Sequence, residues 1–163
     1  MKPDFADTYD ENVWRVYGFI AYRVSSRADA EDLTQQTFER ALRAWARFDP
    51  ARASPATWLL TIAHNLVVDH YRSDRSAEQA PIGPGGVEVE ALPAAEDPGY
   101  DLGVDAALAE ALDALPERDR RIVALRFGGD LNGPEIAELT DLSLANVQQI
   151  LSRSLRALRQ RLE

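Results

Sequence analysis

Apolar residues recur at intervals of three and four along most of this chain, which is the period of amphipathic helices. The pattern predicts helices over residues 11–24, 29–48, 57–72, 104–114, 117–127, 132–139 and 143–163. Strand-like alternation is nearly absent, because the one short run at 87–89 alternates valine with glutamate. The fold class predicted from the sequence is therefore all-α.

Each predicted helix carries one apolar stripe, and the residues of these stripes are the candidate core. In the first half of the chain they are Val13, Trp14, Val16, Tyr17, Phe19, Ile20, Leu33, Thr37, Phe38, Ala41, Leu42, Trp45, Trp58, Leu59, Ile62, Leu66 and Val67. In the last helix they are Val147, Leu151, Leu155, Leu158 and Leu162. All of these side chains are expected to point inward.

Between the two helical halves, residues 80–103 are rich in glycine, proline and acidic residues and show no helical period. Such a composition buries too little apolar surface to offset the entropy of ordering the backbone, about 1–2 kcal/mol per residue. We therefore expect a flexible acidic linker over residues 78–104. It divides the chain into two small helical domains at residues 1–77 and 105–163.

The net charge of −9 at first argues against nucleic acid as a partner, because phosphate groups repel an acidic protein. The distribution of the charge changes that conclusion. Residues 76–104 hold six acidic and no basic residues, so each flanking domain is close to neutral. A domain that is neutral overall can still present a local basic face to phosphate, and DNA stays open as a partner.

The second domain contains a short helix, a three-residue turn at 140–142 and a longer helix, which is the helix-turn-helix pattern. Asn132 or Gly133 suits the start of the short helix as a cap, and Ser143 suits the start of the long one. In helix-turn-helix domains the N-terminal end of the second helix enters the major groove of DNA. The C-terminal domain is therefore predicted to bind DNA.

The outward face of that second helix carries mainly amide and small side chains, at Leu144, Ala145, Asn146, Gln148, Gln149 and Ser152. Amides pair with the N6 and N7 atoms of adenine, so adenine-rich DNA is the expected target. Phosphate contacts are expected from Arg118, Arg120, Arg121, Arg126, Arg153, Arg156, Arg159 and Arg161. The alternative that these arginines form the solvated face of amphipathic helices stays open.

Taken in order, these segments resemble the extracytoplasmic-function (ECF) group of bacterial sigma factors. The sequence DAEDLTQQTFERALRAWARF (29–48) resembles the family helix that docks on core RNA polymerase. TWLLTIAHNLVVDHYR (57–72) resembles the helix that engages the minus-10 promoter element. LPERDRRIVALRF (115–127) and the helix-turn-helix resemble the domain that reads the minus-35 element.

The resemblance implies three sets of site residues. Core polymerase binding falls on Asp29, Glu31, Asp32, Leu33, Gln35, Gln36, Phe38 and Glu39, with Leu33 and Phe38 as an apolar anchor. Minus-10 DNA binding falls on Arg52, Trp58, His64, Asn65, Asp69, Arg72 and Arg75, and the loop at 49–56 forms a pocket for an unstacked base. Minus-35 DNA binding falls on Arg118, Arg121, Ser143, Ala145, Asn146, Gln148, Gln149, Ser152, Arg153 and Arg156. The linker resembles the segment that threads the polymerase cleft, although its charge equally suits solubility.

The chain departs from the family pattern at four positions. Gln36 stands where glutamate is common, Gln148 where a basic residue is customary and Ile150 where arginine is frequent. Asp141 replaces the glycine of the turn, a position that aspartate can fill because it tolerates left-handed backbone. Basic residues are also sparse after the minus-10 helix, so we expect weak affinity for DNA alone.

The sequence points to no catalytic group, metal or cofactor. It has no cysteine, and His64 and His70 lie six positions apart on different faces of one helix. His70 with Asp69 and Ser73 at a helix end lacks the rigid, separate elements of a catalytic triad. Because there is neither a membrane-length apolar run nor a secretory signal, we expect a cytoplasmic protein without membrane insertion.

The leading hypothesis is a sigma factor, which is not an enzyme, with core RNA polymerase and promoter DNA as partners. Whether an anti-sigma factor is a further partner stays open. An alternative is a sigma-like interaction protein that binds polymerase or a regulator without reading promoters, which the depleted basic residues favour. A third hypothesis is a freestanding helix-turn-helix repressor.

Overall fold

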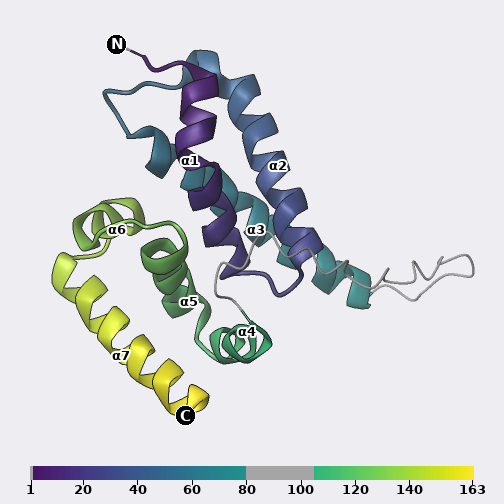
Figure 1. The fold of residues 1–163 in the computed structure, drawn as a ribbon, viewed down its shortest axis with the longest axis vertical. Coiled ribbons are helices and arrows are strands. Elements are labelled where there is room, and N and C mark those ends of the chain that lie inside the picture. The colour runs from purple at the N-terminus through teal and green to yellow at the C-terminus, as the bar shows by residue number, and fades with distance from the viewer. Residues whose placement is uncertain (1, 80–104) are drawn as a thin grey trace, which may run out of the picture.

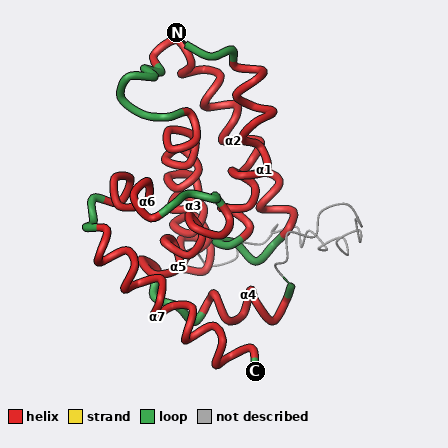
Figure 2. Tube along the Cα trace, turned by 60° about the vertical axis from the view of Figure 1, so that its left-hand side comes forward, coloured by secondary structure: helices red, strands yellow, loops and turns green. Residues whose placement is uncertain are grey.

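The computed structural model describes residues 2–79 and 105–163, and every regular element within them is a helix (Figure 2). The N-terminal half contains α1 (Phe5–Ala21), α2 (Arg27–Ala44), a 3-10 turn (Trp45–Arg47) and α3 (Pro55–Gln79). The C-terminal half contains α4 (Ala106–Asp113), α5 (Glu117–Val123), a π-helical turn (Ala124–Gly128), α6 (Gly133–Thr140) and α7 (Leu144–Leu162). The all-α prediction is confirmed, whereas the acidic linker, from residue 80 onward, lies outside the described residues.

Several helix boundaries differ from the sequence-based prediction. Helix α1 begins at Phe5, six residues before the expected start, because the Phe5 ring packs edge-on against Trp45, with ring centroids 5.3 Å apart. Helix α3 continues to Gln79, beyond the expected end at Arg72. The helix expected over 117–127 changes at Ala124 into the π-helical turn, where the backbone N–H of Gly129 donates to the carbonyl of Ala124 at 2.8 Å.

The predicted caps of the helix-turn-helix are confirmed. The Asn132 side chain accepts from the backbone N–H of Glu135 at 2.9 Å, and the Glu135 carboxylate accepts from the N–H of Asn132 at 3.0 Å, which completes a capping box. Asp141 lies in the left-handed region, with φ 59°. The Ser143 hydroxyl accepts from the N–H of Asn146 at 3.1 Å and starts α7.

In the N-terminal half the three long helices enclose an aromatic cluster at one end. The rings of Trp45 and Phe48 stack with centroids 5.0 Å apart, and Trp58 lies 4.8 Å from Phe48. This cluster confirms the core role expected of Trp58 and fixes the loop that precedes α3. The predictions that Trp14 and Leu42 belong to the core are wrong, because their side chains are 47% and 59% exposed.

The two halves pack directly against each other, with α1 beside the π-helical turn and α6 near α3 (Figure 1). One apolar core runs through both halves: Val16, Phe19 and Ile20 of α1 belong to the same buried cluster as Leu125 and Val147. Nothing in the periodicity of the sequence revealed this contact, because periodicity reports only which face of a helix is apolar and not what covers it.

The inward face of α7 also differs from the prediction. Val147 and Leu158 are buried as expected, and Leu151 is half-buried, but Leu155 is 42% and Leu162 is 49% exposed. Ile150 and Ser154 occupy the buried positions instead. The apolar stripe of α7 therefore extends beyond the face that packs against the rest of the protein. The uncovered residues of the stripe form part of an open groove.

Candidate nucleic-acid and polymerase interfaces

The N-terminal end of α7 presents the side chains predicted to read the minus-35 element. Ala145, Gln148, Gln149 and Ser152 are exposed, and Asn146 is half-buried. Buried Val147 and Ile150 hold the opposite face of the helix against the core. The predicted base-reading set therefore lies together on one solvent-facing surface, with Ser143 as the cap of the helix.

A buried carboxylate organises two of the predicted phosphate-binding arginines. Asp119 is 3% exposed and accepts from Nη2 of Arg153 at 3.0 Å, while Nε of Arg118 lies 3.5 Å from its other oxygen. Both guanidinium groups border a cleft of about 610 Å³ between α5 and α7, next to Arg161. Arg156 is exposed on α7.

Arg121, another of the predicted phosphate-binding arginines, lies in a different environment. It is half-buried on the side of α5 that faces the N-terminal half, and burial lowers the pKa of its guanidinium. In this arrangement Arg121 is separated from the minus-35 set. The prediction that it contacts minus-35 phosphates is not supported by its position.

On α3, Asn65, Asp69 and Arg72 are exposed on one face, as their spacing predicts. The loop before α3 is ordered by short-range bonds: the Asp49 side chain accepts from the N–H of Ala51 at 2.9 Å, and Ser54 accepts from the N–H of Thr57 at 3.2 Å. The Arg52 side chain is 88% exposed beside this loop. Arg75 belongs to α3, and its side chain lies outside the described part of the chain.

His64 belongs to the predicted minus-10 set but points to a different environment. Its Nδ1 lies 3.3 Å from Nη1 of Arg23, a residue with 1% exposure. Burial, with additional repulsion from Arg121 and Arg23, lowers the pKa of His64 to about 4. His64 therefore sits neutral where the two halves meet, apart from the exposed face of Asn65.

The same region holds other long-range contacts that sequence reasoning missed. Nε of Arg120 donates to the carbonyl of Tyr22 at 2.9 Å, and Nη2 of Arg23 lies 3.7 Å from a Glu117 carboxylate oxygen. The Tyr71 hydroxyl donates to the carbonyl of Arg23. The one signal in the sequence was an arginine at position 23 between apolar neighbours, and its partner could not be deduced from it.

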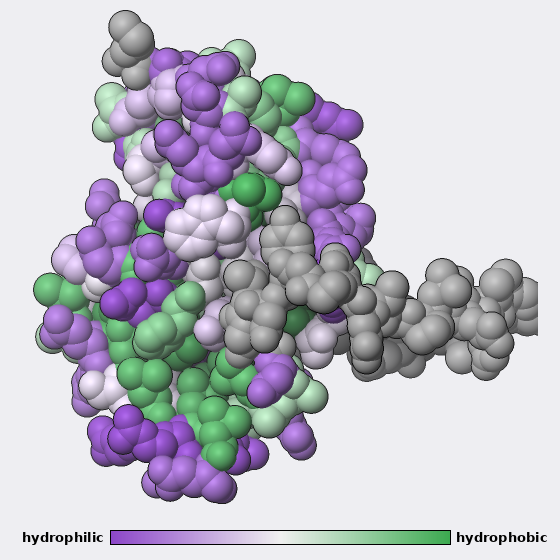
Figure 3. All heavy atoms as spheres, in the orientation of Figure 1, coloured by the Kyte–Doolittle hydropathy of each residue, from purple (hydrophilic) through white to green (hydrophobic). Residues whose placement is uncertain are grey.

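The acidic face predicted to bind core polymerase lies on α2. Glu31, Asp32, Gln35 and Glu39 are exposed there, and Asp29 lies 3.6 Å from Nε2 of His70. Figure 3 shows hydrophilic residues gathered along the upper right, where Figure 1 places α2.

Three other members of the polymerase set differ in exposure. Gln36 is half-buried and donates to the Asp32 carboxylate at 2.7 Å. Leu33 and Phe38 are only 4% and 6% exposed, and the Phe38 ring packs edge-on against Tyr9. The expectation of an apolar surface anchor at these two residues is therefore wrong, because the core of the N-terminal half already covers them.

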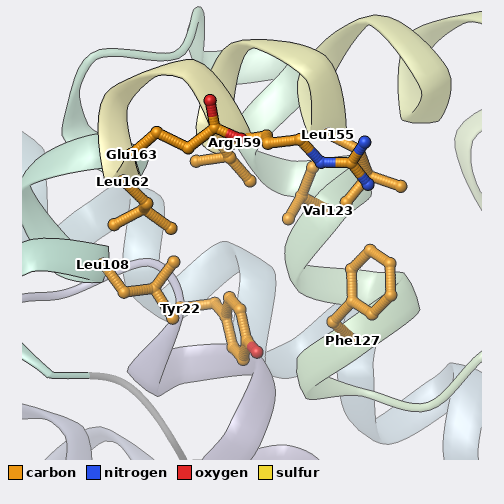
Figure 4. A pocket seen from close by; sticks show the side chains of 9 residues that line it. Tyr22, Leu108, Val123, Phe127, Leu155, Arg159, Leu162 and Glu163 are labelled. Atoms are coloured by element: carbon orange, nitrogen blue, oxygen red, sulfur yellow. The ribbon is translucent and has the colours of Figure 1, made fainter.

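Sequence reasoning also missed an apolar groove of about 460 Å³ on the C-terminal half. Its walls include Leu155 and Leu162 of α7, Phe127 of the π-helical turn and Tyr22 from the N-terminal half (Figure 4). Apolar residues gather on the lower part of the molecule in Figure 3, in the region of α5 and α7. The prediction that Leu155 and Leu162 point into the core concealed this groove.

A second cleft, of about 370 Å³, separates the loop before α3 from α6. Arg52, Ser54 and Thr57 line it from one side, and Glu135 and Glu138 from the other. The predicted minus-10 base pocket therefore faces two carboxylates of the helix-turn-helix.

Among the described residues, no cluster of three histidine, cysteine, aspartate or glutamate side chains could hold a metal ion. Within the same residues, no helix is long and apolar enough to cross a membrane.

Comparison with known families gives two matches along the chain. The model of Sigma-70 region 2 matches residues 8–77, and that of Sigma-70, region 4 matches residues 111–160. The ECF RNA polymerase sigma factor BldN of Streptomyces coelicolor is 38% identical over 157 residues, which cover 95% of this chain and 58% of BldN. SigK of Mycobacterium tuberculosis is 29% identical over 163 residues, covering 95% of this chain and 83% of SigK. This chain thus spans less than two thirds of the length of BldN.

Two solved structures share the fold. RpoE of Bartonella quintana, in complex with the anti-sigma factor NepR, superposes with a TM-score of 0.74 at 21% identity, over 98% of this chain and 96% of RpoE. CnrH, in complex with the cytosolic domain of CnrY, superposes with a TM-score of 0.66 at 23% identity, over 97% of this chain and 86% of CnrH. At these identities the likeness shows the arrangement of the helices.

Proposed function

Since this chain belongs to the ECF group of bacterial sigma factors, we propose that it directs core RNA polymerase to promoters and supports their melting. Its regions 2 and 4 correspond to the helical domains at 1–77 and 105–163, with the acidic linker at 78–104 between them. It is not an enzyme, because recognition and melting proceed by binding and transfer no chemical group. It acts in the cytoplasm, where polymerase and the chromosome are found.

The observation that carries this proposal is the solvent-facing end of α7. Gln148 and Gln149 are exposed at the point where a recognition helix reaches base edges, and Ser143 caps the helix. The paired amides suit adenine. Arg153 and Arg156 follow along the helix, where contacts with the DNA phosphates are expected. This surface anchors the minus-35 element.

The minus-10 element is bound by the exposed face of α3 and by the loop that precedes it. Asn65 and Arg72 contact the strand, and the pocket beside Arg52 takes an unstacked base. Extrusion of a base costs a few kcal/mol, and capture in the pocket offsets that cost. Melting therefore needs no chemical fuel from the sigma factor.

Core polymerase is bound by the carboxylate and amide groups of α2. Glu31, Asp32, Gln35 and Glu39 give a negative surface that is complementary to a basic partner helix. With Leu33 and Phe38 buried, affinity on this face depends on electrostatic contacts. The complex with polymerase is therefore expected to weaken as the salt concentration rises.

Run-off transcription with purified core polymerase and a library of genomic fragments tests the proposal. We expect transcripts that depend on this chain and that share one promoter pattern. A Gln148→Ala and Gln149→Ala double variant should lose most of them, whereas Gln160→Ala, at an exposed position outside the proposed base-reading set, should not.

Two results would favour the other hypotheses. Binding to core polymerase without transcripts from any fragment would indicate a sigma-like interaction protein. Tight and specific binding to duplex DNA in a gel shift, in the absence of polymerase, would indicate a repressor.

An anti-sigma factor is a further partner within the proposal. RpoE and CnrH, which share the fold, are each found in complex with a regulatory protein. Co-purification from the native host, followed by addition of the purified partner to the run-off assay, tests this point. A partner that suppresses the transcripts supports it, and a partner that leaves them unchanged contradicts it.

A further inference from the structure

Asp119 is a charged residue that cannot itself contact DNA, although two predicted phosphate-binding arginines lie beside it. It belongs to the first turn of α5 and is only 3% exposed. A buried carboxylate costs free energy unless positive groups lie next to it, and even a paired buried charge adds little net stability. Stability is therefore a poor reason for an aspartate at this position, and its contacts point to another role.

The contacts of Asp119 join α5 to α7. Nη2 of Arg153 donates to Oδ2 of Asp119 at 3.0 Å, which is a charge-assisted hydrogen bond. Oδ1 accepts no hydrogen bond from the described residues, and Nε of Arg118 lies 3.5 Å from it. The carboxylate thus lies between guanidinium groups from two helices and holds that of Arg153 the more firmly.

Both arginines keep a side that faces solvent. The side chains of Arg118 and Arg153 are 58% and 56% exposed, whereas the carboxylate between them is covered. Arginine carries several N–H groups in a planar fork. Arg153 can therefore donate to Asp119 through one N–H group and to a second anion through the others.

The place of Arg153 on α7 puts it beside the base-reading residues. It follows Gln149 by four positions, so the two side chains share one face of the helix, about 6 Å apart along its axis. When Gln149 lies at the base edges of the major groove, Arg153 lies toward the edge of the groove, where the phosphates run. Arg118 borders the cleft between α5 and α7, two helices that lie side by side in Figure 1.

We propose that Asp119 is a positioning residue for minus-35 binding, which fixes the guanidinium group of Arg153 in the direction of the DNA backbone. The inference rests on the proposed function, because it concerns how the minus-35 surface is built. An arginine loses rotamer freedom when it docks on a phosphate. The hydrogen bond to Asp119 orders Arg153 before DNA arrives and so removes part of that loss.

Two simpler roles of Asp119 predict different results. A carboxylate that only offsets positive charge repels phosphate, so its removal should tighten DNA binding and steepen the salt dependence. A carboxylate that only joins α5 to α7 should affect unfolding but not the DNA affinity of the folded protein. For a positioning residue, removal of the charge should weaken DNA binding and flatten the salt dependence.

Asp119→Asn distinguishes these roles, because asparagine has nearly the shape of aspartate and no charge. The full chain is titrated into a fluorescent duplex of random sequence, about 30 base pairs long, since phosphate contacts do not depend on sequence. We expect Asp119→Asn to weaken binding about fivefold at low salt. The slope of log affinity against log salt should fall by up to about 0.9, the value for one phosphate contact. Glu110→Gln, which removes an exposed carboxylate of α4, is the control for charge alone and should not weaken binding.

A double-variant cycle tests whether Asp119 acts through Arg153. In an Arg153→Ala background, Asp119→Asn should cause little further loss of affinity, because the side chain that it positions is gone. In an Arg156→Ala background it should keep its full effect of about fivefold, because Arg156 lies on the same helix but is not held by Asp119. Circular dichroism and urea denaturation show whether each variant is folded.

Unchanged or tighter binding by folded Asp119→Asn would overturn the proposal, and so would a loss of the same size in the Arg153→Ala background. If Asp119→Asn does not fold, Arg153→Lys decides, because lysine keeps the charge but has no fork to bind carboxylate and phosphate together. Its affinity should fall about threefold, and an unchanged affinity would reject the positioning role.

Run-off transcription by the unsubstituted chain separates this inference from the proposed function. If Asp119 does not position Arg153, the titrations fail but the transcripts remain. If the chain binds the duplex as expected and yields no transcript with core polymerase, the proposed function fails and the role of Asp119 at the phosphate backbone stands. If the unsubstituted chain does not bind the duplex even at low salt, the positioning role itself is rejected.

Discussion

Nη1 of Arg23 lies 3.3 Å from Nδ1 of His64, and because arginine has no acceptor, the histidine must accept this hydrogen bond. His64 is therefore neutral, with its proton on Nε2. Protonation of Nδ1 would remove the hydrogen bond and place a third positive charge beside Arg23 and Arg121. Burial is the main cause of its pKa of about 4, and repulsion by Arg121 and Arg23 lowers this pKa further.

The first prediction is a loss of stability in mild acid. The pKa of His64 is about 6.5 in the unfolded chain and about 4 in the folded protein, so between these values the unfolded state binds more protons. The contribution of His64 to the stability should be constant above about pH 7 and should fall as the pH drops from 6.5 toward 4. Thermal unfolding followed by circular dichroism at pH 7.5 and pH 5 measures this fall.

A His64→Gln variant should flatten part of this dependence, because glutamine does not titrate. His70→Gln is the matched control on the same helix, because it leaves the contact of His64 with Arg23 intact. Equal pH dependence in the unsubstituted protein and in His64→Gln would contradict the assignment.

The second prediction separates the surface of α2 from its buried side. Glu39→Arg reverses an exposed charge, so it should weaken binding to core polymerase about tenfold while the free energy of unfolding stays within about 0.5 kcal/mol. Leu33→Ala creates a cavity in the core and should lower the free energy of unfolding by about 2–5 kcal/mol. Competition for core polymerase and urea denaturation measure the two effects.

If Glu39→Arg leaves polymerase binding unchanged at low salt, the acidic face of α2 is not the docking surface. Arg47→Glu, an exposed reversal outside the proposed set, serves as the control for charge alone.

The third prediction concerns the recognition helix. Gln149→Ala should cost about 1–3 kcal/mol of binding to the preferred minus-35 sequence and relax the preference at one base pair. Arg156→Ala should weaken binding to all sequences alike and reduce the slope of log affinity against log salt by about one. Both are measured by fluorescence anisotropy of the polymerase complex on promoter duplexes at several salt concentrations. If Gln149→Ala weakens binding to all DNA sequences equally, the Gln149 side chain does not contact the bases.

The fourth prediction tests the turn of the helix-turn-helix. Asp141 holds left-handed backbone with φ 59°, a conformation that costs residues with a side chain about 1–2 kcal/mol and glycine little. Asp141→Gly should therefore keep or slightly raise the stability of the protein, by up to about 1 kcal/mol, whereas Asp141→Ala should lower it. Urea denaturation of the pair gives the order, and a more stable alanine variant would contradict the strained turn.

The sequence by itself determined the helices, their caps and the helix-turn-helix, because these depend on contacts between neighbours in the chain. The capping box of Asn132 and Glu135 and the Ser143 cap span three residues each, so their signals were complete in the local sequence. The exposed faces of Gln148 and Asn65 followed from helical spacing in the same way.

Only the tertiary structure decided which apolar and charged faces are covered. Leu33 and Phe38 are buried and Leu155 is open because other helices lie over the first two and none lies over the third. The contact of Asp119 with Arg153, and that of His64 with Arg23, joins residues far apart in the sequence. Helical periodicity repeats every few residues and carries no record of such partners, so only the packed chain reveals them.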